Sequence, residues 1–284
     1  MDPMDEFNRT KDAPFMSTYV HGYSGPETRR LRDQSFILSD LLHHDTRYAP
    51  RERVLEAGCG VGAQTVHLLA GSPEISLTTL DLSLDSLRLA RATLRDMKGP
   101  LPDLLQADLF HLPFGHGVFD HVFVCFVLEH LAEPVGALRQ LKAVLKPGGT
   151  ITVIEGDHGS CFFHPRSQEA GHVWNCLIEA QARLGGDSLI GRRLYPLLCE
   201  AGFETPQVSP RFIYADASRP RWVEYFTVKT IIAMVEGVRE RALAMGLSDP
   251  ARWERGIQAL WRTATPPDGV FCYTFFKGVA QNPG

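Results

Sequence analysis

The stretch VLEAGCGVG (residues 54–62) decides the fold, because in it a short apolar strand runs directly into a turn with three glycines. Glycine permits positive φ angles and lets a ligand approach the backbone closely, and Gly58, Gly60 and Gly62 supply both properties. A helix is expected immediately after the turn, over residues 63–69. A strand, a glycine-rich turn and a helix in this order predict a cofactor loop at the carboxyl end of a strand.

Strands and helices alternate around this loop. Apolar segments with β-branched residues predict the strands, and apolar residues at helical spacing predict the helices between them. The expected strands cover residues 53–57, 76–82, 104–107, 119–128 and 150–155, and the expected helices cover 28–43, 63–69, 83–97 and 134–145. The alternation predicts right-handed βαβ units, and hence an α/β fold with a doubly wound, mostly parallel sheet.

The pattern loosens after residue 155. Helices are expected over residues 168–184, 189–201, 222–245 and 252–262, and strands over 207–214 and 270–278. We therefore expect one main domain over residues 49–284, with substrate-side insertions at about 158–200 and 215–265. An N-terminal lid and helix is expected over residues 17–48. Residues 1–16 are expected to be either a disordered tail or a non-native remnant ahead of a natural start at Met16.

The composition is that of an ordinary globular protein and narrows the classes of partner. The net charge is −4 and the isoelectric point is about 6.3, whereas a nucleic-acid-binding protein usually has a basic face. No apolar run is long enough for a membrane span, and the first residues lack the apolar core of a signal peptide. Six cysteines without a Cys-x-x-Cys pair favour a reducing compartment, so a cytoplasmic location is expected.

The glycine turn alone allows a nicotinamide-dependent oxidoreductase. Ala63 completes the dinucleotide pattern G-x-G-x-x-A, and Asp81 follows Gly62 by 19 residues, close to the spacing of the ribose-binding acid in such enzymes. Glu56 favours a different ligand, because a carboxylate before the glycines repels a pyrophosphate but tolerates an ammonium and a sulfonium. Both alternatives stay open at this point, as does a catalytically inactive protein that only binds the cofactor.

Five short motifs occur in order over about residues 50–155. They are VLEAGCGVG (54–62), LD (80–81), ADL (107–109), FD (119–120) and LKPGG (145–149). This series resembles the successive motifs of the class I S-adenosylmethionine-dependent methyltransferases. The resemblance implies a seven-stranded sheet with an antiparallel last strand, a place that residues 270–278 fit. It also implies S-adenosyl-L-methionine as the cofactor.

The resemblance assigns cofactor contacts residue by residue. Glu56 and the three glycines of the loop would face the methionine part, and Asp81 would hold both ribose hydroxyls. The remaining predicted contacts, to adenine and to the methionine end, follow later strands. They are Asp108 to adenine, Leu82 and Leu109 beside the adenine ring, and Phe126 and His130 at the methionine end.

Catalytic candidates lie at strand ends and ahead of the first helix. His158 is a candidate general base or substrate-orienting group, and Asp157 could orient it, because ligands of open α/β sheets bind at carboxyl strand ends. His130 is an alternative base. Tyr23 belongs to a glycine-broken aromatic segment that could close as a lid over the site. An exposed lid segment invites exchange between protomers, so a homo-oligomer is expected.

The acceptor is expected to be a small, fairly hydrophobic metabolite. The segment after residue 158 is rich in aromatic side chains that suit an apolar pocket, and Tyr19, Phe163, Trp174 and Tyr195 are the candidates. No metal site is expected, because the His–Asp pairs lack the spacing of a ligand set. The segments at 19–24 and 155–158 also resemble a C-methyltransferase of teleocidin-type indole-alkaloid pathways, which implies a prenylated indole as acceptor.

Overall fold

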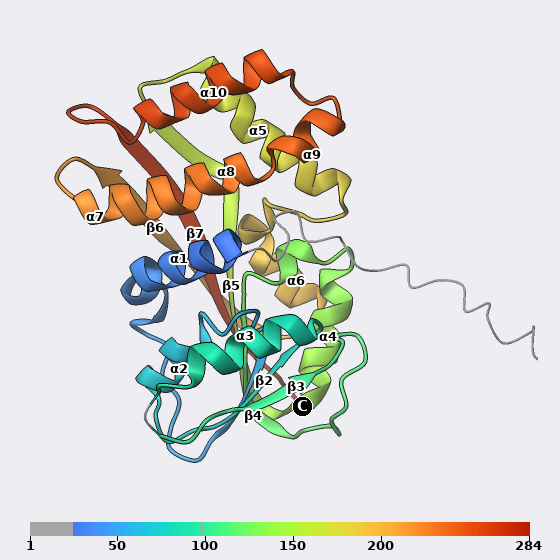
Figure 1. The fold of residues 1–284 in the computed structure, drawn as a ribbon. Helices are drawn as coiled ribbons and strands as arrows, with labels where there is room; N and C mark the ends of the chain where they lie inside the picture. Colours follow the sequence, from blue (N-terminus) through green and yellow to red (C-terminus); the bar gives the residue numbers. More distant parts are fainter. Residues whose placement is uncertain (1–24, 98) are drawn as a thin grey trace, which may run out of the picture.

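The computed structural model describes residues 25–97 and 99–284, which form one seven-stranded sheet with helices on both faces (Figure 1). The strand order is β3-β2-β1-β4-β5-β7-β6, and β7 runs antiparallel to both of its neighbours. The strands are β1 (Arg53–Ala57), β2 (Ser76–Asp81), β3 (Asp103–Gln106), β4 (Phe119–Cys125), β5 (Leu145–His164), β6 (Glu204–Asp216) and β7 (Val270–Gln281). The predicted α/β class, a mostly parallel sheet with an antiparallel last strand, is confirmed.

Alternate residues of the central strands enter two separate cores, because side chains of a strand point to opposite faces with a period of two. Val54 of β1 shares one core with Leu38, and the next residue, Leu55, shares the other with Leu138. Helices α1 (Gly25–His43), α2 (Thr65–Gly71) and α3 (Leu84–Leu94) contribute to the first face; α4 (Pro134–Val144) and α6 (Leu194–Glu200) contribute to the second. Burial on both faces explains the nearly continuous apolar runs in the sequence.

A second group of helices covers the part of the sheet where β5 and β7 extend beyond the parallel strands (Figure 1). Its members are α5 (Gln168–Arg183), α7 (Pro220–Trp222), the π-helix η3 (Val223–Ile232), α8 (Ala233–Gly237), α9 (Arg239–Ala244) and α10 (Pro250–Arg262). Helix α1 packs against both η3 and α2, so it lies between this group and the glycine loop. Two short 3-10 helices, η1 (Leu128–His130) and η2 (Ile190–Arg193), complete the fold.

The single helix predicted over residues 222–245 is wrong, because the structure divides it into α7, η3, α8 and α9. The Thr230 hydroxyl donates to the carbonyl of Tyr225, five residues earlier, at 2.8 Å, which matches the wider turn of a π-helix. β-Branched residues crowd this segment and disfavour a regular α-helical turn.

Strand β5 is longer than the predicted segment 150–155 and contains a bulge. Its antiparallel register with β7 runs to Asp157↔Thr274, shifts, and resumes at Phe162↔Cys272. Residues 158–161 of β5 therefore face a single residue of β7, Tyr273. Bulges of this kind re-aim side chains next to functional sites.

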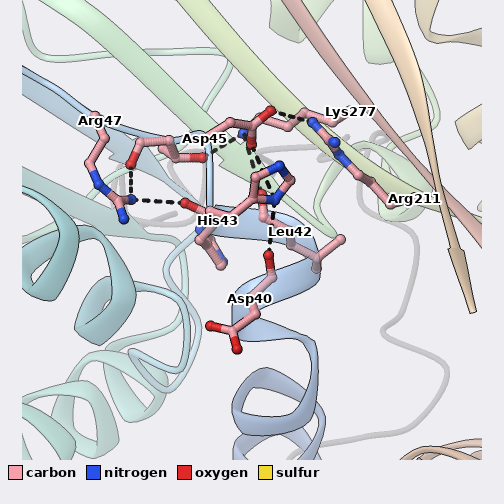
Figure 2. Close-up of polar contacts among 9 residues, drawn as sticks. Asp40, Leu42, His43, Asp45, Arg47, Arg211 and Lys277 are labelled. Atoms are coloured by element: carbon pink, nitrogen blue, oxygen red, sulfur yellow. Dashed lines mark hydrogen bonds and ion pairs between the residues drawn. The ribbon is translucent and has the colours of Figure 1, made fainter.

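A buried lysine fastens the segment after α1 to the sheet. Lys277 of β7 is 3% exposed, and its Nζ donates to Asp45 Oδ1 and Thr46 Oγ1, each at 2.6 Å, and to the carbonyl of Leu42 at 3.3 Å. Arg211 of β6 donates to the second oxygen of Asp45. Figure 2 shows Lys277 and Arg211 converging on Asp45. The end of α1 is thus tied to the antiparallel part of the sheet.

Candidate functional site

The three glycines of the loop all have left-handed backbone conformations, but they differ in how closely other atoms pack against them. Gly58, Gly60 and Gly62 have φ angles of +79°, +52° and +76°, which side-chain-bearing residues rarely adopt. A Cβ at Gly58 would lie 3.1 Å or less from both γ-methyl carbons of Val127, and a Cβ at Gly62 would lie 3.1 Å from the Ala90 backbone. A Cβ at Gly60 would meet no atom of the described residues within 4 Å. The loop is therefore packed at its flanks and open at its centre.

Asp81 at the end of β2 is bonded to this loop. Its Oδ2 accepts from the backbone N–H of Gly60 at 2.8 Å, and its Oδ1 accepts from that of Ser83 at 2.9 Å. Burial raises the pKa of the Asp81 carboxyl, and the two backbone donors act against that rise. Asp108, after β3, is more exposed; its carboxylate accepts from the backbone N–H of Phe110 and pairs with His111.

Glu56 is buried beneath the loop. It is 2% exposed, and its Oε2 accepts from the Thr65 hydroxyl at 2.7 Å. Burial raises the pKa of its carboxyl to about 7, and the neighbouring Asp81 contributes in the same direction. Neither Glu56 nor Gly62 lines the adjoining cavity, whereas Gly58 and Gly60 do.

A cavity of about 490 Å³ lies at the carboxyl ends of the parallel strands. All six of the other predicted cofactor residues line it, namely Asp81, Leu82, Asp108, Leu109, Phe126 and His130. His158, a predicted catalytic residue, lines it as well. The opposite wall is largely apolar and comes from α1, η3, α8 and β7; it includes Leu31, Phe226, Ile231, Met234 and Phe275. One cavity thus joins the glycine loop to an apolar chamber.

The short helix η1 brings a carboxylate to the cavity, and a buried glutamate fixes that helix. Glu155 Oε1 accepts from the backbone N–H groups of Val127 and Leu128, at 2.9 and 2.7 Å. Burial is the main cause that raises the pKa of Glu155 well above its ordinary value, and the negative charge of the nearby Glu129 is a second cause. Burial also acts to raise the pKa of Glu129, but the neighbouring His130 and His158 hold it below its ordinary value. Glu129 therefore carries the negative charge of this pair into the cavity wall.

His158 is held on several sides. Its Nδ1 lies 2.8 Å from the Tyr273 hydroxyl, and its ring stacks on Trp174 with centroids 5.1 Å apart. The Trp174 indole N–H donates to the His158 carbonyl at 2.8 Å. Nε2 of His158 is buried and has no hydrogen-bond partner among residues 25–97 and 99–284. Burial lowers the pKa of this imidazole, so a neutral ring faces the cavity.

Several predicted residues lie elsewhere than expected. Asp157 does not bond to the His158 ring; its carboxylate accepts from the Arg192 guanidinium and from the Gly159 backbone N–H. Phe163 and Tyr195 do not line the cavity: Phe163 stacks on Phe271, and Tyr195 is 55% exposed on α6. Trp174 supports His158 from behind and is likewise absent from the cavity wall. None of the three lines this cavity, and their assignment to a substrate pocket stays a prediction.

Two predicted residues, Tyr19 and Tyr23, lie outside the described residues, as do the tail and the lid segment before α1. No sequence motif selects Arg30, Glu129 or Tyr273, which all line the cavity. Arg30 of α1 is 7% exposed and donates to the Glu27 carboxylate through two nitrogens.

Residues 25–97 and 99–284 contain no helix that is both long and apolar enough to cross a bilayer. Over the same ranges, no three side chains of histidine, cysteine, aspartate or glutamate gather as ligands for a metal ion. All six cysteines are free thiols.

Comparison with known proteins places this site in a family context. A family model described as a methyltransferase domain matches residues 55–153. An uncharacterised methyltransferase of Schizosaccharomyces pombe is 28% identical over 193 residues, which cover 64% of this chain and 68% of that protein. A ubiquinone/menaquinone biosynthesis C-methyltransferase of Syntrophotalea carbinolica is 31% identical over 179 residues, which cover 57% of this chain and 73% of that protein.

A solved structure shares the fold over most of the chain. It is a phosphoethanolamine N-methyltransferase of Haemonchus contortus in complex with phosphomonomethylethanolamine and S-adenosylhomocysteine. The TM-score is 0.54 at 16% sequence identity, and the match covers 89% of this chain and 53% of that one. At this identity the likeness concerns the fold alone.

Proposed function

The chain belongs to the class I S-adenosylmethionine-dependent methyltransferases, and we propose that its acceptor is a small, fairly hydrophobic metabolite such as a natural-product intermediate. The observation that carries this proposal is the division of the cavity. One end has the open glycine and the strand-end acids, and the other end has an apolar wall with few polar groups. Pockets that are mostly apolar and contain a few placed polar groups are typical of small-molecule sites.

The residues at the first end fit the cofactor. The space above Gly60 lets a ligand approach the backbone, and the carboxylate of Asp81 is held by two backbone donors at that place. We assign Asp81 to the ribose hydroxyls, and Asp108, with Leu82 and Leu109, to the adenine. The methionine part is assigned to Gly58 and Gly60, with Phe126 and His130 at its end and Glu56 acting from below the loop.

When bound, S-adenosylmethionine supplies an electrophilic methyl group on a sulfonium sulfur. The protein's task is then to align the acceptor with that methyl and to exclude water, since methyl transfer depends mainly on positioning and desolvation. Phe226, Ile231 and Met234 of the apolar wall serve both purposes by enclosing an apolar acceptor. His158 is the polar group that orients it.

A mass-spectrometric assay tests this function. The full chain is incubated with S-adenosylmethionine and a panel of metabolites that offers carbon, nitrogen and oxygen acceptors, including a prenylated indole. We expect one CH₂ to be added to an apolar member and not to strongly polar members, and we expect Asp81→Ala to lower the activity at limiting S-adenosylmethionine. Methylation of strongly polar members alone would overturn the acceptor class.

A thermal-shift measurement with S-adenosylhomocysteine and with NAD distinguishes a methyltransferase from a nicotinamide-dependent oxidoreductase. Stabilisation by S-adenosylhomocysteine and not by NAD is expected, because a ligand that binds only the folded state raises its melting temperature. Stabilisation by NAD alone would contradict the cofactor assignment. Binding of S-adenosylhomocysteine without turnover of any panel member would favour a protein that only binds the cofactor.

A further inference from the structure

The β5 bulge places His158 directly against Tyr273. Four residues of β5, 158–161, stand opposite Tyr273 alone, since the register is Asp157↔Thr274 before the bulge and Phe162↔Cys272 after it. Ser160 closes the bulge: its hydroxyl donates to the carbonyl of Asp157 at 2.7 Å and accepts from the backbone N–H of Thr274 at 3.0 Å. The contact between the His158 and Tyr273 side chains is thus built into the strand pairing.

The backbone and the ring of His158 are both fixed. Its N–H donates to the carbonyl of Ser188 at 2.9 Å, and its carbonyl accepts from the Trp174 indole at 2.8 Å. The Trp174 ring stacks on the imidazole at an interplanar angle of 28°. With Nδ1 against the Tyr273 hydroxyl, Nε2 is the one ring nitrogen of His158 without a hydrogen-bond partner in the described part of the chain.

The proton in the 2.8 Å contact belongs to the phenol. Tyr273 is 2% exposed, and within the described residues its hydroxyl has no other hydrogen-bond partner. If Nδ1–H donated to the phenol oxygen, the phenol proton would be a buried donor without an acceptor, which is costly. If the phenol donates to Nδ1, that donor is satisfied and the ring proton sits on Nε2. The first arrangement leaves two groups unpaired, the phenol proton and the Nε2 lone pair, whereas the second leaves one, the Nε2–H of a cavity-lining residue.

The charged groups around His158 shift the pKa of its imidazole in opposite directions, and burial has the largest effect on that pKa. Burial lowers the pKa of the imidazole; Glu129 and Asp157 act to raise it, and Arg30 and His130 act to lower it. The net direction is downward, so the ring is neutral at pH 7 and has one N–H to offer.

We propose that Tyr273 is a positioning residue that holds His158 as the Nε2–H tautomer, and that this N–H donates to an oxygen of the methyl acceptor. The second half rests on the proposed function. A neutral N–H donor matches a carbonyl, enolate or hydroxyl oxygen, and it stabilises negative charge on that oxygen without taking up a proton. The acceptor class is therefore an apolar metabolite with an oxygen function at the His158 end, and His158 serves as donor and not as the initial base.

Nuclear magnetic resonance of the full chain labelled with ¹⁵N-histidine tests the tautomer without any acceptor. Long-range ¹H–¹⁵N correlations distinguish a protonated from a bare ring nitrogen, and His158→Gln identifies the signals by their loss. In the wild-type protein with S-adenosylhomocysteine at pH 7, we expect a protonated Nε2 and a bare Nδ1. In Tyr273→Phe we expect this preference to be lost, with the two nitrogens averaging. A protonated Nδ1, a doubly protonated ring, or an unchanged tautomer in Tyr273→Phe would overturn the proposal.

A second variant keeps the test decisive if Tyr273→Phe does not fold. A methyl group added at Gly156 would overlap the Tyr273 hydroxyl, so Gly156→Ala should displace it and cause the same loss of preference. Calorimetry with S-adenosylhomocysteine on the same samples reports the cofactor site separately, so failure of the proposed function is distinguishable from failure of the tautomer.

The metabolite panel tests the oxygen partner. Methylation should be confined to members with a carbonyl or hydroxyl group, and kcat/KM for them should fall at least tenfold in His158→Phe, which lacks the donor. Equal turnover of members without oxygen would overturn the assignment.

Discussion

The backbone N–H of Gly60 donates to Oδ2 of Asp81 at 2.8 Å and ties the glycine loop of β1 to the end of β2. The other oxygen, Oδ1, accepts from the N–H of Ser83, the residue that caps α3. One carboxylate therefore fixes the open glycine, the strand end and the helix start together. The two motifs that the sequence places 21 residues apart form a single unit at the cavity.

Asp81→Ala is expected to weaken the binding of S-adenosylhomocysteine by about tenfold to a hundredfold, because hydrogen bonds to charged groups contribute about 1.5–3 kcal/mol. Isothermal calorimetry on the full chain measures the change. Asp85→Ala, in the first turn of α3, removes an exposed carboxylate that pairs with Arg88 and is the matched control. An unchanged affinity in Asp81→Ala would refute the ribose assignment.

Glu56→Gln is expected to change how stability depends on pH. Burial raises the pKa of this carboxyl from 4.5 to about 7 in the folded chain. Because the folded state binds the proton more tightly, the stabilising contribution of the protonated acid is complete below about pH 4.5 and is lost as pH rises to about 7. The ionised form then costs on the order of 3 kcal/mol relative to a neutral side chain.

Urea unfolding of the cofactor-free protein at several pH values checks this expectation. The stability of Glu56→Gln minus that of the wild type should rise between pH 5 and pH 7 and level off above, because glutamine keeps an acceptor for Thr65 without a charge. A difference that stays flat or falls over this interval would show that burial does not raise the pKa of Glu56.

Asp45→Ala is expected to destabilise the fold by about 3 kcal/mol, because it leaves the buried ammonium of Lys277 without its carboxylate. Lys277→Met should lower the free energy of unfolding by less, since Asp45 is 42% exposed and keeps its ion pair with Arg211 (Figure 2). Denaturant unfolding of both variants and the double variant measures the coupling. If Asp45→Ala costs no more than the exposed control Asp85→Ala, the pair does not hold the end of α1 to the sheet.

Glu155 should tolerate glutamine and not alanine. Burial and, to a lesser extent, the nearby Glu129 raise the pKa of its carboxyl well above the ordinary value, so the side chain is neutral and glutamine resembles it. Glutamine also keeps an oxygen that accepts from the N–H groups of Val127 and Leu128. Glu155→Ala leaves these buried donors unpaired, which costs about 2 kcal/mol and lowers the melting temperature by roughly 4–8 °C. Scanning calorimetry distinguishes the two, and equal losses in both variants would contradict this role of Glu155.

The cofactor end of the site could be predicted because its residues belong to short motifs that directly follow strands. Gly60, Asp81 and Asp108 each follow a strand of a parallel sheet, and parallel strands end at the same edge, so motif order alone brings them to one cavity. The alternation of strands and helices likewise predicted the fold class. These features depend on segments that are close in sequence.

The acceptor side could not be predicted in the same way. Tyr273 meets His158 only through an antiparallel register and a bulge between strands more than a hundred residues apart. Aromatic character predicts Phe163 and Tyr195 as pocket residues, but neither lines the cavity. Composition does not indicate toward which face of a strand or helix a side chain points. The wall from η3 was hidden because a π-helix has no distinct periodic signal in this sequence.

A crystal structure of the full chain with S-adenosylhomocysteine tests most directly whether one cavity holds the cofactor at the glycine loop and the acceptor at His158. The ribose hydroxyls should lie on Asp81, and the sulfur should face the apolar chamber of Phe226 and Met234 within reach of His158. A ligand bound away from Asp81, or with its sulfur turned from that chamber, would contradict the account.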